Sequence, residues 1–204
     1  MTLSTKWAET CQKLGIRKRE NAFQHLLSCY REPHRHYHNL DHIAMGLIAL
    51  KKFPNPLPER AIIALAYWFH DAVYDPTGFD NEEQSAALAA SFVPHELHKR
   101  VVQLILATKL DHTPSTRSEQ IICDIDLAIF GQDWQTYLAY ECAIRKEYAF
   151  VPEVGFCLRR KHILVQFLHK PRIYQTNHAH VQFEKQAREN LLRAVDLLSS
   201  YPAI

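Results

Sequence analysis

The chain has 204 residues, of which 47% are hydrophobic and 23% are charged, and its formal net charge is +2 at pH 7. This length and composition are typical of one globular domain with a sizeable core and exclude two large domains. A net charge this small, without a long basic tract, does not favour nucleic-acid binding, and no uncharged apolar stretch approaches the roughly 18 residues of a membrane span.

Apolar residues recur at helical spacing through nearly the whole chain, which has only five glycines. We therefore predict an all-α protein, a single helical bundle over residues 1–204. Pro58 is expected in the first turn of the helix that leads into His70, Asp80 and Asp133 as N-caps, and Gly131 as a C-cap. The predicted helices with two defined ends cover residues 5–14, 17–31, 39–53, 94–108, 121–130, 133–148, 152–168 and 177–199, with a polar loop over 109–117 and a further helix starting at 81.

The five cysteines are odd in number and widely spaced, with no C-x-x-C pair. This pattern argues against a disulfide framework or a structural zinc knuckle. Together with an N-terminus that lacks the layout of a signal peptide, it predicts a cytoplasmic protein without a membrane anchor. The thirteen histidines are unusual and indicate metal or acid–base chemistry.

Three segments carry side chains that suit a metal ion. The apolar run over 61–69 ends in His70 and Asp71, and burying Asp71 there is costly unless an ion such as a metal compensates its charge. His38 and His42 are four apart, so at a helix start they face the same way, and one could bind metal while the other acts as an acid. Taken alone, this pair could equally be two surface histidines.

Asp124 and Asp126 interrupt the third segment, the apolar stretch over 121–130. An unpaired carboxylate there would be destabilising by several kcal/mol, roughly the penalty of a buried ion. The two aspartates cannot share a helix face, so one should point inward while the other caps the helix or hydrogen-bonds locally. Together the segments offer a mixed nitrogen and oxygen donor set suited to Fe, Mn, Co, Ni or Zn.

The order H…HD…D in this context resembles the HD superfamily of metal-dependent phosphohydrolases. The block Tyr37-His38-Asn39-x-x-His42 is also similar to the first metal motif of class I cyclic-nucleotide phosphodiesterases. A bacterial group of predicted HD phosphohydrolases resembles the chain more closely, from about residue 37 to residue 190. The further motifs that carry this resemblance are Phe69-His70-Asp71-x-x-Tyr74, Asn81-Glu82-x-x-Ser85-Ala86 and Asp124-x-Asp126-Leu127.

The resemblance implies an HD-type domain, with a motif core over about 37–148 and a helical extension over 152–200. It makes His42, His70, Asp71 and Asp126 the ligands of one divalent ion, for which Mg is a further candidate, and His38 the proton donor to the leaving group. Asp126 is preferred to Asp124 because Asp126-Leu127 matches the Asp-Leu that ends the last motif of the family. Many HD proteins carry His-Glu where this chain has Asn81-Glu82, so one ion is expected, although Asp71 could bridge to a second.

A bound divalent ion lowers the pKa of its water from about 16 towards roughly 7 and polarises a phosphoryl oxygen, whose developing charge needs fixed cations. The resemblance favours Arg145 and Tyr148 as pocket residues, followed by Lys109 and His112, although a single Lys or Arg usually lies at the surface. Glu82 could orient a ligand histidine or a water, or could be a solvent-facing glutamate of a first helical turn.

The expected function is hydrolysis of a phosphate ester or anhydride in a nucleotide or another small phosphorylated molecule, by hydroxide at the metal. The alternative is a non-catalytic HD-fold module that senses a nucleotide or a partner. A di-iron oxygenase needs more ligands than these motifs guarantee. A guanosine tetraphosphate hydrolase is disfavoured because Ala72-Val73-Tyr74 follows Asp71 in place of an acidic pair. The sequence leaves open the substrate, the native metal and whether the chain forms a homo-oligomer.

Overall fold

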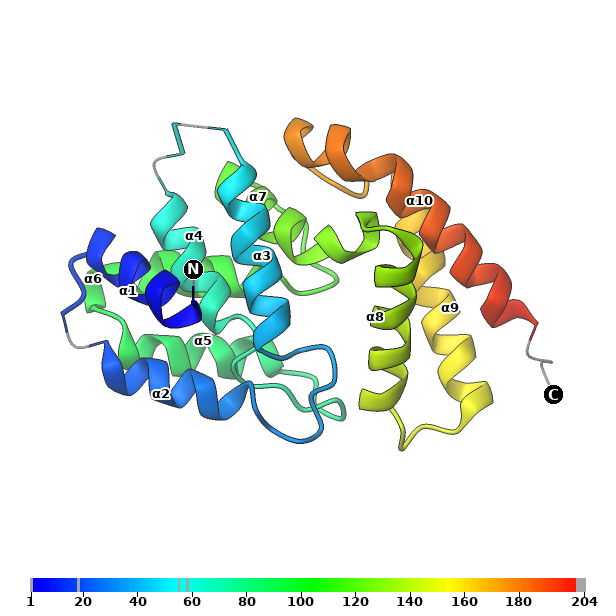
Figure 1. Cartoon of the computed structure of the whole chain (residues 1–204), viewed down its shortest axis with the longest axis horizontal. Helices are drawn as coiled ribbons and strands as arrows, with labels where there is room; N and C mark the ends of the chain where they lie inside the picture. Colours follow the sequence, from blue (N-terminus) through cyan, green and yellow to red (C-terminus); the bar gives the residue numbers. More distant parts are fainter. Residues whose placement is uncertain (1, 18, 55, 58, 201–204) are drawn as a thin grey trace. The chain divides into compact units, whose positions relative to one another are not determined.

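The computed structural model describes residues 2–17, 19–54, 56–57 and 59–200. Within these ranges the chain forms ten α-helices, one 3₁₀ helix and no strand, so the all-α prediction is confirmed (Figure 1). Pro58 lies outside the described residues. None of the described helices is long and apolar enough to cross a membrane. The elements are α1 (Leu3–Lys13), α2 (Glu20–Cys29), α3 (Leu40–Lys52), α4 (Arg60–Phe69), α5 (Asn81–Phe92), α6 (His95–Leu106), α7 (Arg117–Asp126), the 3₁₀ helix η1 (Leu127–Gly131), α8 (Trp134–Glu147), α9 (Glu153–His169) and α10 (Asn177–Ser199).

Backbone contacts divide the chain into two compact units, Met1–Asp126 and Leu127–Ile204. The first holds α1 to α7, and the second holds η1 and α8 to α10. Their boundary falls inside the motif core expected over 37–148. That core, the extension over 152–200 and the single domain over 1–204 remain predictions.

Helix α4 is the centre of the first unit and contacts α1, α3, α5, α6 and α7. Its sequence is apolar on all sides, which is typical of a helix enclosed by others, and every residue from Ile62 to Phe69 is buried. The ring of Trp68 on α4 meets the ring of Trp7 on α1 edge to face, with centroids 5.5 Å apart. Because His70 and Asp71 follow α4 directly, the most buried helix of the unit fixes their place.

The helix expected over 121–130 differs from the structure at both ends. Helix α7 begins at Arg117, inside the polar loop expected over 109–117, because Thr116 and Glu119 form a capping box. The Glu119 amide donates to the Thr116 hydroxyl at 3.2 Å, and the Thr116 amide donates to the Glu119 carboxylate at 3.2 Å. The single helix expected over 121–130 was also wrong, since α7 ends at Asp126 and η1 follows. Asp80 stands at the N-cap position of α5, but its carboxylate accepts from the Gln84 side chain at 2.8 Å instead of a backbone amide.

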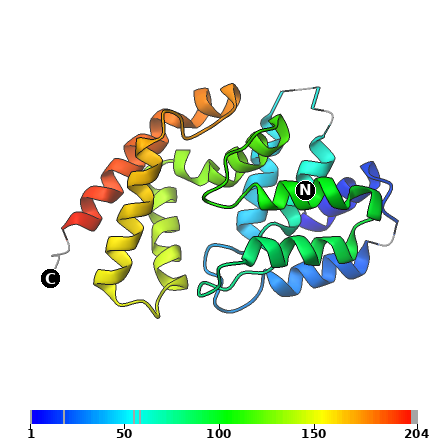
Figure 2. The same ribbon diagram turned by 180° about the vertical axis from the view of Figure 1, so that it is seen from behind.

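In the second unit, α10 lies along α9 and packs on η1 (Figure 2). Asp133 caps α8 as predicted and accepts the amides of Gln135 and Thr136 at 3.1 Å each. Gly131 ends η1 without the left-handed backbone of a glycine C-cap. It is a glycine because a Cβ there would lie 2.5 Å from the Cβ of Phe183 on α10.

Candidate metal centre

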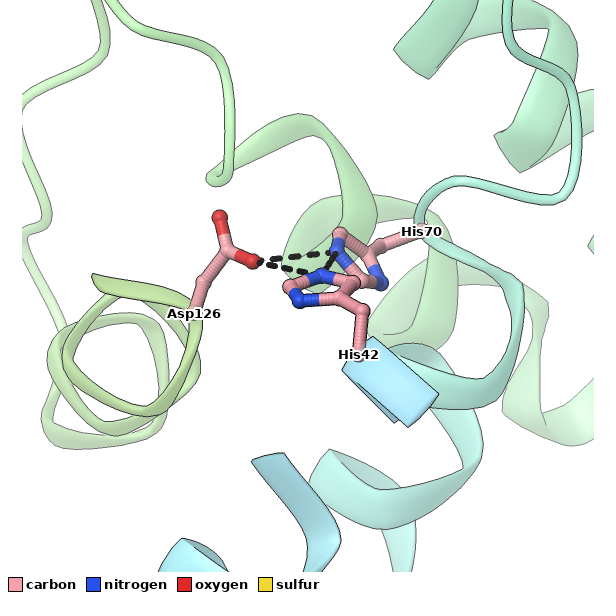
Figure 3. A group of neighbouring side chains, drawn as sticks. All are labelled: His42, His70 and Asp126. Atoms are coloured by element: carbon pink, nitrogen blue, oxygen red, sulfur yellow. Dashed lines mark hydrogen bonds and ion pairs between the residues drawn. The ribbon is translucent and has the colours of Figure 1, made fainter. Parts of the chain in front are cut away.

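Three helices of the first unit bring one side chain each to a common point (Figure 3). His42 lies in the first turn of α3, which begins where the Asn39 side chain accepts the Asp41 amide at 2.9 Å. His70 follows α4, and Asp126 is the last residue of α7. Both histidines are buried, with 3% and 1% of their surface exposed. The structure therefore brings together three residues that the sequence spreads over positions 42 to 126.

The donor atoms of these residues form a nearly equilateral triangle. His42 Nε2 lies 3.2 Å from His70 Nε2, and Asp126 Oδ1 lies 3.1 Å from the former and 3.2 Å from the latter. Donors that share one ion at bonds of about 2.1 Å are about 3.0 Å apart in octahedral geometry and about 3.4 Å apart in tetrahedral geometry. The three separations fall inside that range, so these residues fit one transition-metal ion.

Asp71 provides a fourth donor next to this triangle. Its Oδ2 lies 3.0 Å from His70 Nε2 and 3.4 Å from His42 Nε2. Three of the four expected ligands, His42, His70 and Asp126, thus form a group that could hold an ion, and Asp71 lies beside its two histidines. Asp71 as a ligand stays a prediction. Asp124 is buried, but it does not join the group of histidines and carboxylates that could hold an ion.

Hydrogen bonds behind the histidines orient their rings. His70 Nδ1 lies 2.9 Å from the Tyr67 carbonyl, which can only accept, so Nδ1 carries a proton and the neutral ring would offer its lone pair at Nε2. His42 Nδ1 lies 3.1 Å from the Tyr37 hydroxyl, which can accept in the same way. In this arrangement two imidazole nitrogens and the carboxylate of Asp126 converge, and a positive charge between them, a proton or a metal ion, makes that favourable.

The electrostatics of the cluster show that it attracts positive charge. Burial opposes a charge on His42 and His70, yet the carboxylates of Asp126 and Asp71 outweigh it and raise the pKa of both imidazoles. Burial likewise opposes ionisation of the two aspartates, but the neighbouring histidines hold the pKa of both carboxyl groups below the ordinary value. Both carboxylates are therefore ionised at neutral pH, which is the state that binds a metal.

His38 lies beside the centre but precedes α3, so its place does not depend on the helical spacing expected for it. Its ring centroid is 5.8 Å from that of His42, and its ring stacks on Tyr74 at 4.2 Å. The charge of His38 also helps to lower the pKa of Asp71, after burial and the larger effects of His70 and His42. His38 is thus close enough to the donors to serve a reaction there.

Arg35 has an important place that the sequence did not reveal. Its side chain is fully buried, and its guanidinium donates to the carbonyls of His38 at 3.1 Å, Asp71 at 2.6 Å and Ala72 at 3.0 Å. Its Nε bonds Glu32 at 2.9 Å. An arginine two residues after Pro33, in a loop rich in polar side chains, gives no sign in the sequence that it will be buried.

Glu82 is electrostatically coupled to the centre, whereas Lys109 pairs with a neighbour of Glu82. Burial raises the pKa of the Glu82 carboxyl, its own backbone amide opposes this, and the nearby charge of Asp71 raises it further. Lys109 Nζ lies 2.5 Å from a carboxylate oxygen of Glu83. The roles of Glu82 in orienting a ligand and of Lys109 in holding phosphate stay predictions.

The remaining pocket candidates make contacts of a structural kind. His112 Nε2 lies 3.5 Å from the Glu119 carboxylate at the start of α7. In the second unit, Arg145 bonds Glu153 at 2.8 Å and the Tyr148 carbonyl at 2.7 Å. The substrate-binding roles of His112, Arg145 and Tyr148 stay predictions.

No protein-family model, curated protein or solved structure matches this chain. The donor set and the residues that surround it are therefore the basis on which a function can be assigned.

Proposed function

We propose that the chain is a metal-dependent phosphohydrolase of the HD type that acts on a nucleotide or another small phosphate ester or anhydride. The observation that carries this proposal is the convergence of two imidazole nitrogens and a carboxylate oxygen within 3.1 to 3.2 Å of one another, with Asp71 beside them. Two histidines and two aspartates form a donor set for Fe, Mn, Co, Ni or Zn, and Mg is a further candidate.

The charges of the ligands suit a phosphate substrate. Asp71 and Asp126 together contribute two negative charges, while His42 and His70 bind as neutral groups. A divalent ion would cancel the negative charge of the centre, so an anionic phosphate is not repelled. When bound, such an ion supplies a water of lowered pKa and a Lewis acid for a phosphoryl oxygen.

His38 is the group that we assign to the proton of the leaving oxygen. An imidazole can donate a proton near neutral pH, and it must reach the reacting atoms directly or through one water. Stacking on Tyr74 holds the ring, and Arg35 holds the His38 carbonyl, so the donor is positioned before a substrate arrives. Its ring centroid lies 5.8 Å from that of His42, so His38 is a direct neighbour of a ligand.

The test is a metal analysis followed by a substrate screen. Purified protein is analysed for transition metals, loaded in turn with Mn²⁺, Co²⁺, Ni²⁺, Zn²⁺ and Mg²⁺, and assayed with phosphomonoesters, phosphodiesters and nucleoside triphosphates. Asp71→Ala and Asp126→Asn should lose bound metal and turnover together. Asp41→Asn is the matched control, because this exposed carboxylate is next to His42 and should leave both unchanged.

Two outcomes would contradict the proposal. Wild-type metal content and turnover in Asp71→Ala would remove the centre from the reaction. A bound metal without release of phosphate or nucleotide from any compound would favour the non-catalytic sensor instead.

A further inference from the structure

Tyr67 contacts both ligand histidines and has no role in the centre as described so far. It is fully buried on α4, three residues before His70, which is a spacing that places two side chains on one face of a helix. Its ring stacks on the His70 imidazole, with centroids 4.4 Å apart and planes 16° apart. Its hydroxyl lies 3.2 Å from His42 Nε2, the atom that faces the two carboxylates.

Two independent constraints from Tyr67 act on His70. The Tyr67 carbonyl accepts from His70 Nδ1 at 2.9 Å and fixes the edge of the imidazole, while the Tyr67 ring lies against its face. Free rotation about the bond to the imidazole would move Nε2 away from the other donors. The carbonyl belongs to the backbone and survives any substitution, so only the second constraint depends on the tyrosine side chain.

Gly46 provides the space for this ring. It lies on α3, four residues after His42 and thus on the same face of that helix. A Cβ at Gly46 would lie 2.1 Å from Tyr67 Cε1, 2.2 Å from Cζ and 2.3 Å from the hydroxyl oxygen. Non-bonded carbon and oxygen atoms do not approach a Cβ this closely, so any other residue at position 46 would push the Tyr67 ring away or separate α3 from α4.

We propose that Tyr67 is a positioning residue of the metal centre, whose ring fixes the plane of His70, and that Gly46 is a glycine to admit this ring. The proposal rests on the proposed function only in requiring that the four donors bind a metal. The sequence motif identifies His70 as a ligand but does not set the orientation of its imidazole, which the proposal assigns to the buried ring of Tyr67.

The experiment compares metal affinity in three variants of α4, measured by competition with a chromophoric chelator and by the visible absorption spectrum of bound Co²⁺. Tyr67→Leu removes the ring and should weaken binding roughly 10- to 100-fold, as is usual when the support of a ligand is lost. Tyr67→Phe keeps the ring and should bind within about 3-fold of wild type. Phe69→Leu is the matched control for lost packing, because Phe69 is equally buried on α4 but packs on Trp7 and Phe92.

A double-mutant cycle tests the role of Gly46. Gly46→Ala alone should weaken metal binding and lower the melting temperature of the metal-free protein. In the Tyr67→Leu background its additional cost should largely disappear, because leucine lacks the three ring atoms that the methyl group would meet. The melting temperature is a readout that needs no metal, so the cycle remains informative if a variant is only partly stable.

The results separate this proposal from the proposed function. Equal metal affinity in wild type and Tyr67→Leu overturns the role of Tyr67 while the phosphohydrolase proposal stands. Equal weakening in Tyr67→Phe and Tyr67→Leu overturns the assignment to the ring. An unchanged cost of Gly46→Ala in the Tyr67→Leu background overturns the role of Gly46. A wild-type protein that binds none of the ions contradicts the proposed function itself.

Discussion

The guanidinium of Arg35 donates a 2.6 Å hydrogen bond to the backbone carbonyl of Asp71. The same nitrogen reaches the carbonyl of His38, and the other terminal nitrogen reaches that of Ala72. Arg35 therefore ties the loop that carries His38 to the segment that carries Asp71. The residues that we propose as proton donor and metal ligand are thus held together through their backbone carbonyls.

Arg35→Lys should destabilise the protein and slow turnover while the four metal donors remain. Lysine keeps the charge but lacks the planar fork that reaches three carbonyls, and each buried group left without a partner costs about 1 to 3 kcal/mol. We expect a loss of about 2 to 4 kcal/mol in the free energy of unfolding, measured with urea. Arg31→Lys is the control, since Arg31 is exposed on the same loop. A wild-type unfolding curve for Arg35→Lys would show that the carbonyls find other partners.

Metal binding should stabilise the folded protein through the four proposed ligands, His42, His70, Asp71 and Asp126. An ion that binds only the folded state at about 1,000 times its dissociation constant adds about 4 kcal/mol. Chelation with EDTA should therefore lower the melting temperature of the wild type, and restored metal should raise it again. Asp126→Asn should respond to neither treatment, whereas Asp41→Asn should respond like the wild type. If neither chelation nor added metal changed the melting temperature of the wild type, the protein would have no specific metal site.

Local pattern predicted most of the helices, because periodicity and capping depend on neighbours in the sequence. The prediction for 177–199 matches α10 to the residue, and the apolar run over 61–69 contains the buried part of α4, residues 62–69. The start of α7 was missed although its capping box, Thr116 and Glu119, can be read from the sequence.

Contacts between residues of different helices could not be predicted from the sequence. Spacing shows that Tyr67 shares a face with His70 and that Gly46 shares one with His42, but not that these faces meet. The burial of Arg35 depends equally on tertiary packing. The expected ligands came from motif resemblance, and their convergence within hydrogen-bonding distance follows from how α3, α4 and α7 pack.

The Glu119 carboxylate should make stability depend on pH in the acid range. Burial opposes its ionisation, but bonds from Ser115, Gln103 and the Thr116 amide lower its pKa from 4.5 to about 2. Because the folded pKa is depressed, the stabilisation is fully present above pH 4.5 and is lost as the pH falls towards 2. Its size is on the order of 3 kcal/mol.

Glu119→Gln should therefore be less stable than wild type at pH 7, and the gap should close between pH 4.5 and about 2 in urea titrations. Glu96→Gln changes an exposed glutamate in the first turn of α6 and serves as the control, with a small and pH-independent effect. A gap for Glu119→Gln that stays constant down to pH 2 would mean that hydrogen-bond geometry, and not charge, stabilises the start of α7.

His38→Gln should keep the metal and lose turnover, because the side chain lies beside the donors without belonging to them. Loss of a general acid lowers rates by roughly 10²- to 10⁴-fold. The loss should be large for an alkyl phosphate ester, whose leaving oxygen needs a proton, and small for a nitrophenyl ester, whose leaving group departs as a stable anion. His36→Gln, at an exposed histidine of the same loop, should affect both esters little. If His38→Gln slowed both esters equally, His38 would be a binding group and the proton would come from elsewhere.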